Sequence, residues 1–152
     1  TGWTTDELID AIEEEENLGE NFDFVSLLIG VNNQYRNYPI DDYKVQFRQL
    51  LTKALFFAGN NREKVFVVSI PDYAYTPFGN GSQSISQGID NYNAINKEIS
   101  ADIGIQYFDI TPISREGFND PELVANDGLH PSGKQYTEWV KLMLPILKTK
   151  IE

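Results

Sequence analysis

The sequence has no cysteine and only one histidine among its 152 residues. Without cysteine the chain can form no disulfide, no thiolate nucleophile and no cysteine-ligated zinc site. A single histidine leaves no cluster of imidazoles for a metal ion, and no glycine-rich loop of the phosphate-binding type occurs. These absences remove sulfur chemistry and the common zinc sites from the functions open to this chain.

Positive charge is also scarce, and no long apolar run is present. Lys and Arg number 12 against 23 Asp and Glu, which gives a formal net charge of −11. This excess repels the phosphates of nucleic acids and anionic membrane surfaces, so we expect neither as a partner. No apolar stretch reaches the roughly 18 residues that a membrane-spanning helix needs. Neutral or cationic small molecules remain as candidate substrates.

The apolar residues follow the pattern of an α/β protein. Short apolar runs at 22–29, 64–70 and 105–110 predict buried parallel strands. The stretches 25–29 and 65–68 are nearly continuous, as expected when both faces of a sheet are covered. Apolar residues at steps of three and four around these runs predict helices, which are marked by Leu8 to Ile12, Tyr43 to Ala58, Ile85 to Ile99 and Tyr136 to Leu147. We therefore predict one domain over residues 1–152, an α/β sandwich with helices on both faces of a parallel sheet.

The only histidine lies in a turn just before the last predicted helix. Segment 126–132 reads Asn-Asp-Gly-Leu-His-Pro-Ser, and Ser132 with Gln135 predicts a capping box. A carboxylate three positions before an imidazole, as Asp127 is to His130, suits an acid–base pair in which the aspartate fixes the tautomer. The alternative is a plain surface turn, of which Asn-Asp-Gly is also typical. Chemistry on parallel sheets gathers beyond the carboxyl ends of the strands, where this segment is expected.

Two further segments are expected at the same edge of the sheet. Segment 30–33, Gly-Val-Asn-Asn, follows the first predicted strand, and the side-chain amide of Asn32 can donate a hydrogen bond to a developing oxyanion. Gly2 precedes the helix start predicted at Thr4 and offers a backbone amide near the positive end of the helix dipole. The alternative for both is an ordinary loop, because asparagine and glycine are common in turns.

In this order, the three segments resemble the SGNH hydrolases, also called the GDSL esterase/lipase family. Gly2 matches the glycine block of that family, and Asn32 matches its asparagine block. Asp127 and His130, in Asp-Gly-Leu-His-Pro-Ser, match its histidine block. Segment 29–36 is similar to the bacterial esterase-type branch. The resemblance covers nearly the whole chain and implies a three-layer α/β/α sandwich with a flavodoxin-like parallel sheet.

Two features depart from the family pattern. Asn33 stands where the family usually has aspartate, which alters local hydrogen bonding and leaves Asn32 as the oxyanion donor. The nucleophile block Gly-Asp-Ser occurs nowhere in the chain. Six serines of the chain do not fit the role of nucleophile. Two lie in predicted strands (Ser26 and Ser69), one caps the last helix (Ser132), and three lie in the polar loop after residue 81 (Ser82, Ser84 and Ser86). We therefore expect the nucleophile and its strand to precede Thr1, so that the 152 residues form an N-terminally incomplete domain.

The resemblance implies hydrolysis of carboxylic esters, acetyl esters of carbohydrates among them, without a metal ion or cofactor. His130 would be the general base, Asp127 would orient it, and a serine outside the chain would attack the ester. Asn32, the Gly2 amide and the amide of that serine would hold the oxyanion. The alternative is a non-catalytic module on the same scaffold that binds a glycan or another small molecule, with aromatic candidates at Tyr73, Tyr75 and Phe78.

Overall fold

A short parallel sheet lies at the centre of the structure, a computed structural model that describes residues 2–15, 18–19 and 21–150. Its strands are β1 (Val25–Leu27), β2 (Val65–Val68) and β3 (Gln106–Phe108), in the order β1-β2-β3. Val25 pairs with Val65, and Phe66 pairs with Gln106, both in parallel. The predicted parallel α/β fold is confirmed.

Helices precede, connect and follow the strands. They are α1 (Thr5–Glu14), α2 (Val31–Tyr35), α3 (Ile40–Phe57), α4 (Gln83–Ile103), α5 (Thr111–Ser114) and α6 (Gly133–Lys148). Short 3-10 helices are η1 (Arg62–Lys64), η2 (Tyr73–Tyr75), η3 (Arg115–Phe118) and η4 (Pro121–Leu123). At the acidic C-terminal end of α1, Glu13 pairs with Lys53 at 3.0 Å.

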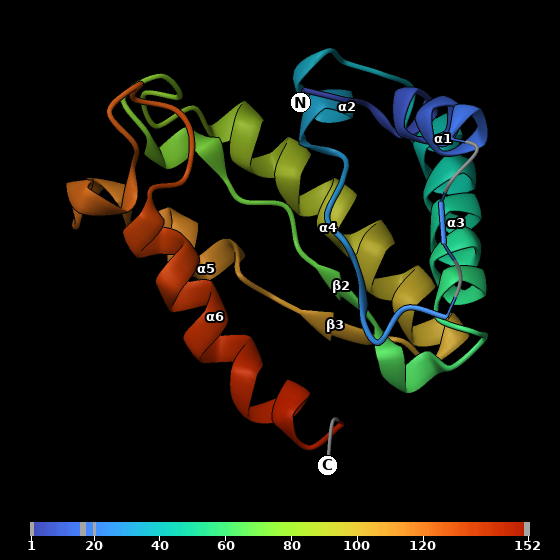
Figure 1. Ribbon diagram of the computed structural model, residues 1–152. Helices are drawn as coiled ribbons and strands as arrows, with labels where there is room; N and C mark the ends of the chain where they lie inside the picture. Colours follow the sequence, from blue (N-terminus) through green and yellow to red (C-terminus); the bar gives the residue numbers. More distant parts are fainter. Residues whose placement is uncertain (1, 16–17, 20, 151–152) are drawn as a thin grey trace.

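The helices cover both faces of the sheet (Figure 1). Consecutive strands step in one direction across the sheet, and right-handed crossovers then place α3 and α4 on the same face. The core on that face includes Phe47, Leu51, Val65, Val67 and Ile89, all of them fully buried. The chain leaving β3 returns as α6, whose Trp139 packs with Val68 and Ile110 on the opposite face.

The strands are shorter than the apolar runs that predicted them. The runs at 64–70 and 105–110 continue to Ile70 and Ile110, which follow the last paired residues of β2 and β3. Both isoleucines are fully buried, in the two separate cores of the sheet. Their apolar character therefore reflects burial beneath the loops and helices, not strand pairing.

Tyr43 of α3 fixes the turn that follows β1. Its fully buried hydroxyl lies 2.6 Å from Asn96 Oδ1 and 3.1 Å from the carbonyl oxygen of Ile29. Burial raises the pKa of the Tyr43 hydroxyl, which therefore stays neutral and donates. Gly30 has φ +121°, and a Cβ at this position would lie 2.5 Å from the Tyr43 hydroxyl. The contact therefore requires glycine directly before α2, the helix that carries Asn32.

We expect Tyr43→Phe to lower the free energy of unfolding by about 1–3 kcal/mol, because the buried Asn96 Oδ1 loses its donor. Urea denaturation followed by circular dichroism measures the change. Tyr136→Phe, at a residue that is 53% exposed, is the control and should change it by less than about 0.5 kcal/mol. Equal effects of the two substitutions would contradict this role for Tyr43.

Candidate active site

The loops at the carboxyl edge of the sheet enclose a cavity of about 430 Å³. Gly2, Asn32 and His130, three residues selected from the sequence, all line it. Asp127 lies next to the cavity and contacts the His130 ring. Because these residues come from three separate segments, the fold brings them together from distant parts of the chain.

Asp127 and His130 form a hydrogen-bonded pair. Asp127 Oδ2 lies 2.7 Å from His130 Nδ1, while Oδ1 accepts the backbone N–H groups of Leu129 and His130, each at 2.9 Å. The backbone N–H of His130, then that of Leu129, then the His130 ring lower the pKa of the Asp127 carboxyl from 3.8 to about 2. An ionised carboxylate on Nδ1 favours the tautomer with the proton on that nitrogen, which leaves the Nε2 lone pair available as a base.

The turn that carries this pair is closed by the backbone. Val124 and Pro131 form an antiparallel bridge, and Ala125 N donates to the carbonyl of His130 at 2.8 Å. Within the turn, Gly128 adopts φ +73° and donates to the carbonyl of Ala125 at 2.9 Å. The bridge holds the two sides of the turn together, so the spacing of Asp127 and His130 does not depend on the side chains alone.

The predicted capping box after the turn is half correct. Ser132 is the N-cap of α6, and its hydroxyl accepts the backbone N–H of Gln135 at 3.2 Å. The Gln135 side chain does not return to the Ser132 backbone but donates to the carbonyl of Leu123 at 2.9 Å. The reason is that the Ser132 N–H is already bonded to that same carbonyl, also at 2.9 Å.

Asn32 occupies the first turn of α2 and is held toward the N-terminal segment. Its Nδ2 donates to the carbonyl of Trp3 at 3.2 Å, which uses one of the two N–H bonds of the amide. Arg36, one turn further along, donates from Nη2 to the carbonyl of Gly2 at 2.8 Å and pairs with Glu7 at 2.9 Å. These bonds place Gly2 beside Asn32 on the cavity wall.

Asn33 completes this attachment, a role that the sequence did not reveal. The residue is fully buried; its Oδ1 accepts the backbone N–H of Thr5 at 3.1 Å, and its Nδ2 donates to Thr5 Oγ1 at 2.7 Å. It therefore ties the start of α1 to α2. Of the two asparagines, only Asn32 lines the cavity, and its role as oxyanion donor stays a prediction.

Aromatic rings form one wall of the cavity. Tyr35, Tyr73 and Phe78 contact one another with ring centroids 6.2–6.4 Å apart. The Tyr73 hydroxyl donates to Gln34 Oε1 at 2.8 Å, and burial raises the pKa of Tyr73. Tyr35 was not predicted from the sequence as part of the site, although its position three residues after Asn32 in a helix places it on the same face. Tyr75, which was selected, packs instead against Phe118.

No serine is hydrogen-bonded to the His130 ring within the described residues, which include every serine of the chain. Ser114 lines the cavity, but its hydroxyl donates to the carbonyl of Thr111 at 2.7 Å and accepts the Asp72 N–H at 2.8 Å. Ser82 and Ser84 are bonded to each other at 3.0 Å. In the described chain, His130, Asn32 and Gly2 thus share a cavity in which no serine is hydrogen-bonded to the imidazole.

Over the described ranges, no group of three or more His, Asp or Glu residues could hold a metal ion. The same part of the chain has no helix with the length and apolar character needed to cross a membrane.

Solved structures of known proteins share this fold. Acetylxylan esterase Axe2 from Geobacillus stearothermophilus superposes with a TM-score of 0.72 at 22% identity, over 97% of this chain and 68% of that chain. The lipase/acylhydrolase from Enterococcus faecalis superposes with a TM-score of 0.67 at 23% identity, over 98% of this chain and 71% of that chain. At these identities the likeness shows the fold alone. No curated protein matches by sequence.

Sequence comparison with protein families is more decisive. The profile of the GDSL-like Lipase/Acylhydrolase family matches residues 1–137, which include Gly2, Asn32, Asp127 and His130. With the parallel sheet and the cavity at its carboxyl edge, this match shows that the chain belongs to the GDSL-like lipase/acylhydrolase family.

Proposed function

We propose that this chain carries most of the active site of a serine esterase that hydrolyses neutral carboxylic esters. The observation that carries the proposal is the cavity shared by His130, Asn32 and Gly2, with Asp127 bonded to the imidazole behind it. His130 Nε2 takes the proton of a serine hydroxyl as its oxygen attacks the ester carbonyl, and later returns that proton to the leaving alcohol. The Asn32 side chain and the Gly2 amide donate to the oxyanion.

The nucleophile in this proposal is a serine that precedes Thr1. Two observations support it. β1 lies at the end of the strand order, so its outer edge has no partner strand among the described residues and can accept another parallel strand. Variants described as catalytic mutants of Axe2 replace a serine, an aspartate and a histidine, the last two three positions apart. Asp127 and His130 have the same spacing.

The cavity favours an uncharged substrate. Asp72 is the one carboxylate among the lining residues, and its fully buried side chain is paired with Arg115 at 2.9 Å. The exposed rings of Tyr35 and Phe78 offer apolar surface to the substrate. Among neutral esters we favour acetylated carbohydrates, the substrate class named for the Axe2 enzymes.

The second candidate function is a non-catalytic module that binds a glycan or another small molecule. It is favoured by the absence of a serine hydrogen-bonded to His130 in the described chain and by the aromatic wall. The coding sequence upstream of Thr1 separates the two. A Gly-Asp-Ser segment after an apolar strand supports the esterase, and its absence supports the binding module.

We predict that residues 1–152 alone hydrolyse p-nitrophenyl acetate no faster than their His130→Ala variant. The protein extended upstream should be active and should be labelled by a fluorophosphonate serine probe, because only this form holds the nucleophile. Removing one member of such a triad leaves about 10³–10⁴-fold acceleration over water. Probe-sensitive hydrolysis by residues 1–152 would place the nucleophile on a serine of the present chain.

In the active, extended protein, Asn32→Ala should lower kcat by about 10²–10³-fold, because one preorganised oxyanion donor is lost. Steady-state kinetics on a short ester measure the effect. Asn91→Ala, at an exposed position on α4, is the matched control and should leave kcat unchanged. A normal kcat for Asn32→Ala would remove Asn32 from the oxyanion site.

The Asp127 carboxyl should titrate with a pKa of about 2 in NMR spectra of the side-chain carboxyl carbon. Its stabilisation of the turn is then present above pH 3.8 and is lost as pH falls through about 2. His130→Ala should raise this pKa only part of the way, because both backbone N–H donors stay. A return to 3.8 in the variant would show that the ring, not the backbone, controls the carboxylate.

A further inference from the structure

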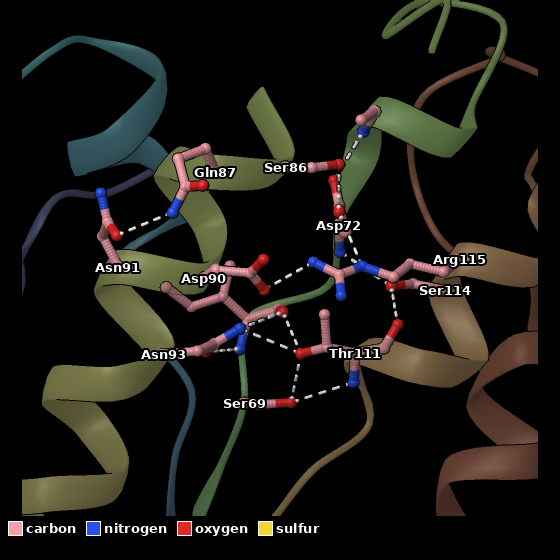
Figure 2. A network of polar contacts seen from close by, with 12 residues as sticks. Ser69, Asp72, Ser86, Gln87, Asp90, Asn91, Asn93, Thr111, Ser114 and Arg115 are labelled. Carbon is pink, nitrogen blue, oxygen red and sulfur yellow. Dashed lines mark hydrogen bonds and ion pairs between the residues drawn. The ribbon is translucent and has the colours of Figure 1, made fainter. Parts of the chain in front are cut away.

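A buried carboxylate lies beside the cavity and has no part in the proposed chemistry. Asp72 follows β2, and its side chain is fully buried. Oδ1 accepts the N–H of Ala74 at 3.0 Å, while Oδ2 accepts Ser86 Oγ at 2.7 Å and Arg115 Nε at 2.9 Å (Figure 2). Arg115 extends to Asp90 on the surface of α4 at 2.6 Å. One carboxylate thus joins the end of β2 to α4 and η3.

The backbone of Asp72 is held as firmly as its side chain. Its N–H donates to Ser114 Oγ at 2.8 Å, and that hydroxyl donates to the carbonyl of Thr111 at 2.7 Å (Figure 2). Because the Asp72 side chain is fully buried, loss of Arg115 would leave its charge uncompensated, so the carboxylate strongly favours the arrangement that satisfies it. Asp72 is therefore an anchor for the chain that leaves β2.

The segment anchored in this way, residues 72–81, folds tightly on itself; we call it the η2 loop. Thr76 Oγ1 donates to the carbonyl of Tyr73 at 2.8 Å and accepts the N–H of Gly79 at 3.1 Å. A Cβ on Gly79 would lie 1.9 Å from the Tyr73 carbonyl oxygen, so only glycine permits this approach. The far end closes through Gly81 N, which donates to the carbonyl of Ala74 at 2.8 Å.

The η2 loop contacts the turn that carries the histidine. Phe78 N donates to the carbonyl of Gly128 at 3.0 Å, and Gly128 lies between Asp127 and His130 in sequence. A Cβ on Gly128 would lie 3.4 Å from Pro77 Cβ, so the Pro77 ring also packs against this glycine. A continuous set of bonds therefore leads from the Asp72 carboxylate to the Asp127–His130 turn.

We propose that Asp72, held by Arg115 and Ser86, is a positioning residue that acts through the η2 loop on the Asp127–His130 pair. The consequence for catalysis rests on the proposed function, whereas the consequence for the geometry of the pair does not. Asp72 touches neither the imidazole nor the expected reacting atoms; it fixes the loop on which the histidine turn rests. A role in folding alone would lower stability without altering the surroundings of His130 in molecules that remain folded.

Asp72→Asn in the 152-residue chain separates these roles. An asparagine whose oxygen still accepts the Ala74 N–H turns its NH₂ group toward Arg115 Nε, so two donors face each other. Because His130 is the only histidine, its imidazole C–H signals in NMR spectra are assigned without ambiguity. We expect these signals to shift and the pKa of the Asp127 carboxyl to rise from about 2 toward 3.8, as the two backbone donors of the turn lose their fixed geometry.

Asp90→Asn is the matched control, because it removes the exposed partner of the same arginine and leaves Asp72 paired. It should keep the wild-type imidazole signals and Asp127 titration. Ser86→Ala removes a single donor from Asp72, and alanine suits the α4 interior, so this variant should fold. It should shift the same signals in the same direction by a smaller amount.

If Asp72→Asn does not fold, Ser86→Ala decides by the same measurements. The proposal is overturned if a folded Asp72→Asn variant keeps the wild-type imidazole signals and Asp127 titration. Where that variant cannot be measured, the same result for Ser86→Ala overturns it. In the active, extended protein, Asp72→Asn should lower kcat by about 10- to 100-fold, the effect of a small misplacement of a catalytic group. Shifted NMR signals without any ester hydrolysis would uphold the positioning role and count against the esterase.

Discussion

Beyond the end of a buried strand, the backbone N–H and C=O groups need hydrogen-bond partners outside the sheet. The site depends on the side chains that provide these partners. Ile70 follows β2, is fully buried, and has its N–H and C=O both bonded to the side chain of Asn93, at 2.8 and 3.0 Å. Asn93 also donates to Thr111 Oγ1 at 2.9 Å, and Thr111 donates to Ser69 Oγ at 2.8 Å. Figure 2 shows this set beneath the Asp72 pair. The loops after β2 and β3 therefore leave the sheet from fixed points.

Two supports then hold the residues of the cavity. In the first, Asn33 and Arg36 hold the N-terminal segment, so that Gly2 lies beside Asn32. In the second, the η2 loop contacts the histidine turn through Gly128. The first support uses side-chain bonds to backbone groups, and the second uses a bond between two backbone groups. Both kinds of hydrogen bond restrict direction more strongly than apolar contacts do. Each bond contributes only about 0.5–1.5 kcal/mol, so the arrangement depends on many of them together.

The parts of this arrangement that could be predicted from the sequence are those set by local chemistry. Periodic apolar residues predicted the parallel sheet and its helices, and the Asp127–His130 spacing predicted their contact, because a turn of four residues joins them. The roles of Asn33 and Asp72 could not be predicted, since their partners Thr5 and Ser86 are distant in sequence or belong to another element. The predicted ends of the strands were wrong for a similar reason. Buried residues and strand-paired residues are both apolar, so the sequence pattern does not distinguish them.

The same distinction bears on whether the chain is an enzyme or a binding module. The Asp127–His130 contact is local and exposed, with 71% of the His130 side chain accessible. A surface turn in a protein without catalytic activity can therefore contain the same contact. The approach of Asn32 and Gly2 to the same cavity is not local. It requires the Asn33 and Arg36 bonds, a glycine at position 30 and the Tyr43 contact behind it. A module that only binds has no need of backbone and amide donors beside a base with an available Nε2. Their convergence, more than the histidine motif itself, therefore favours ester hydrolysis.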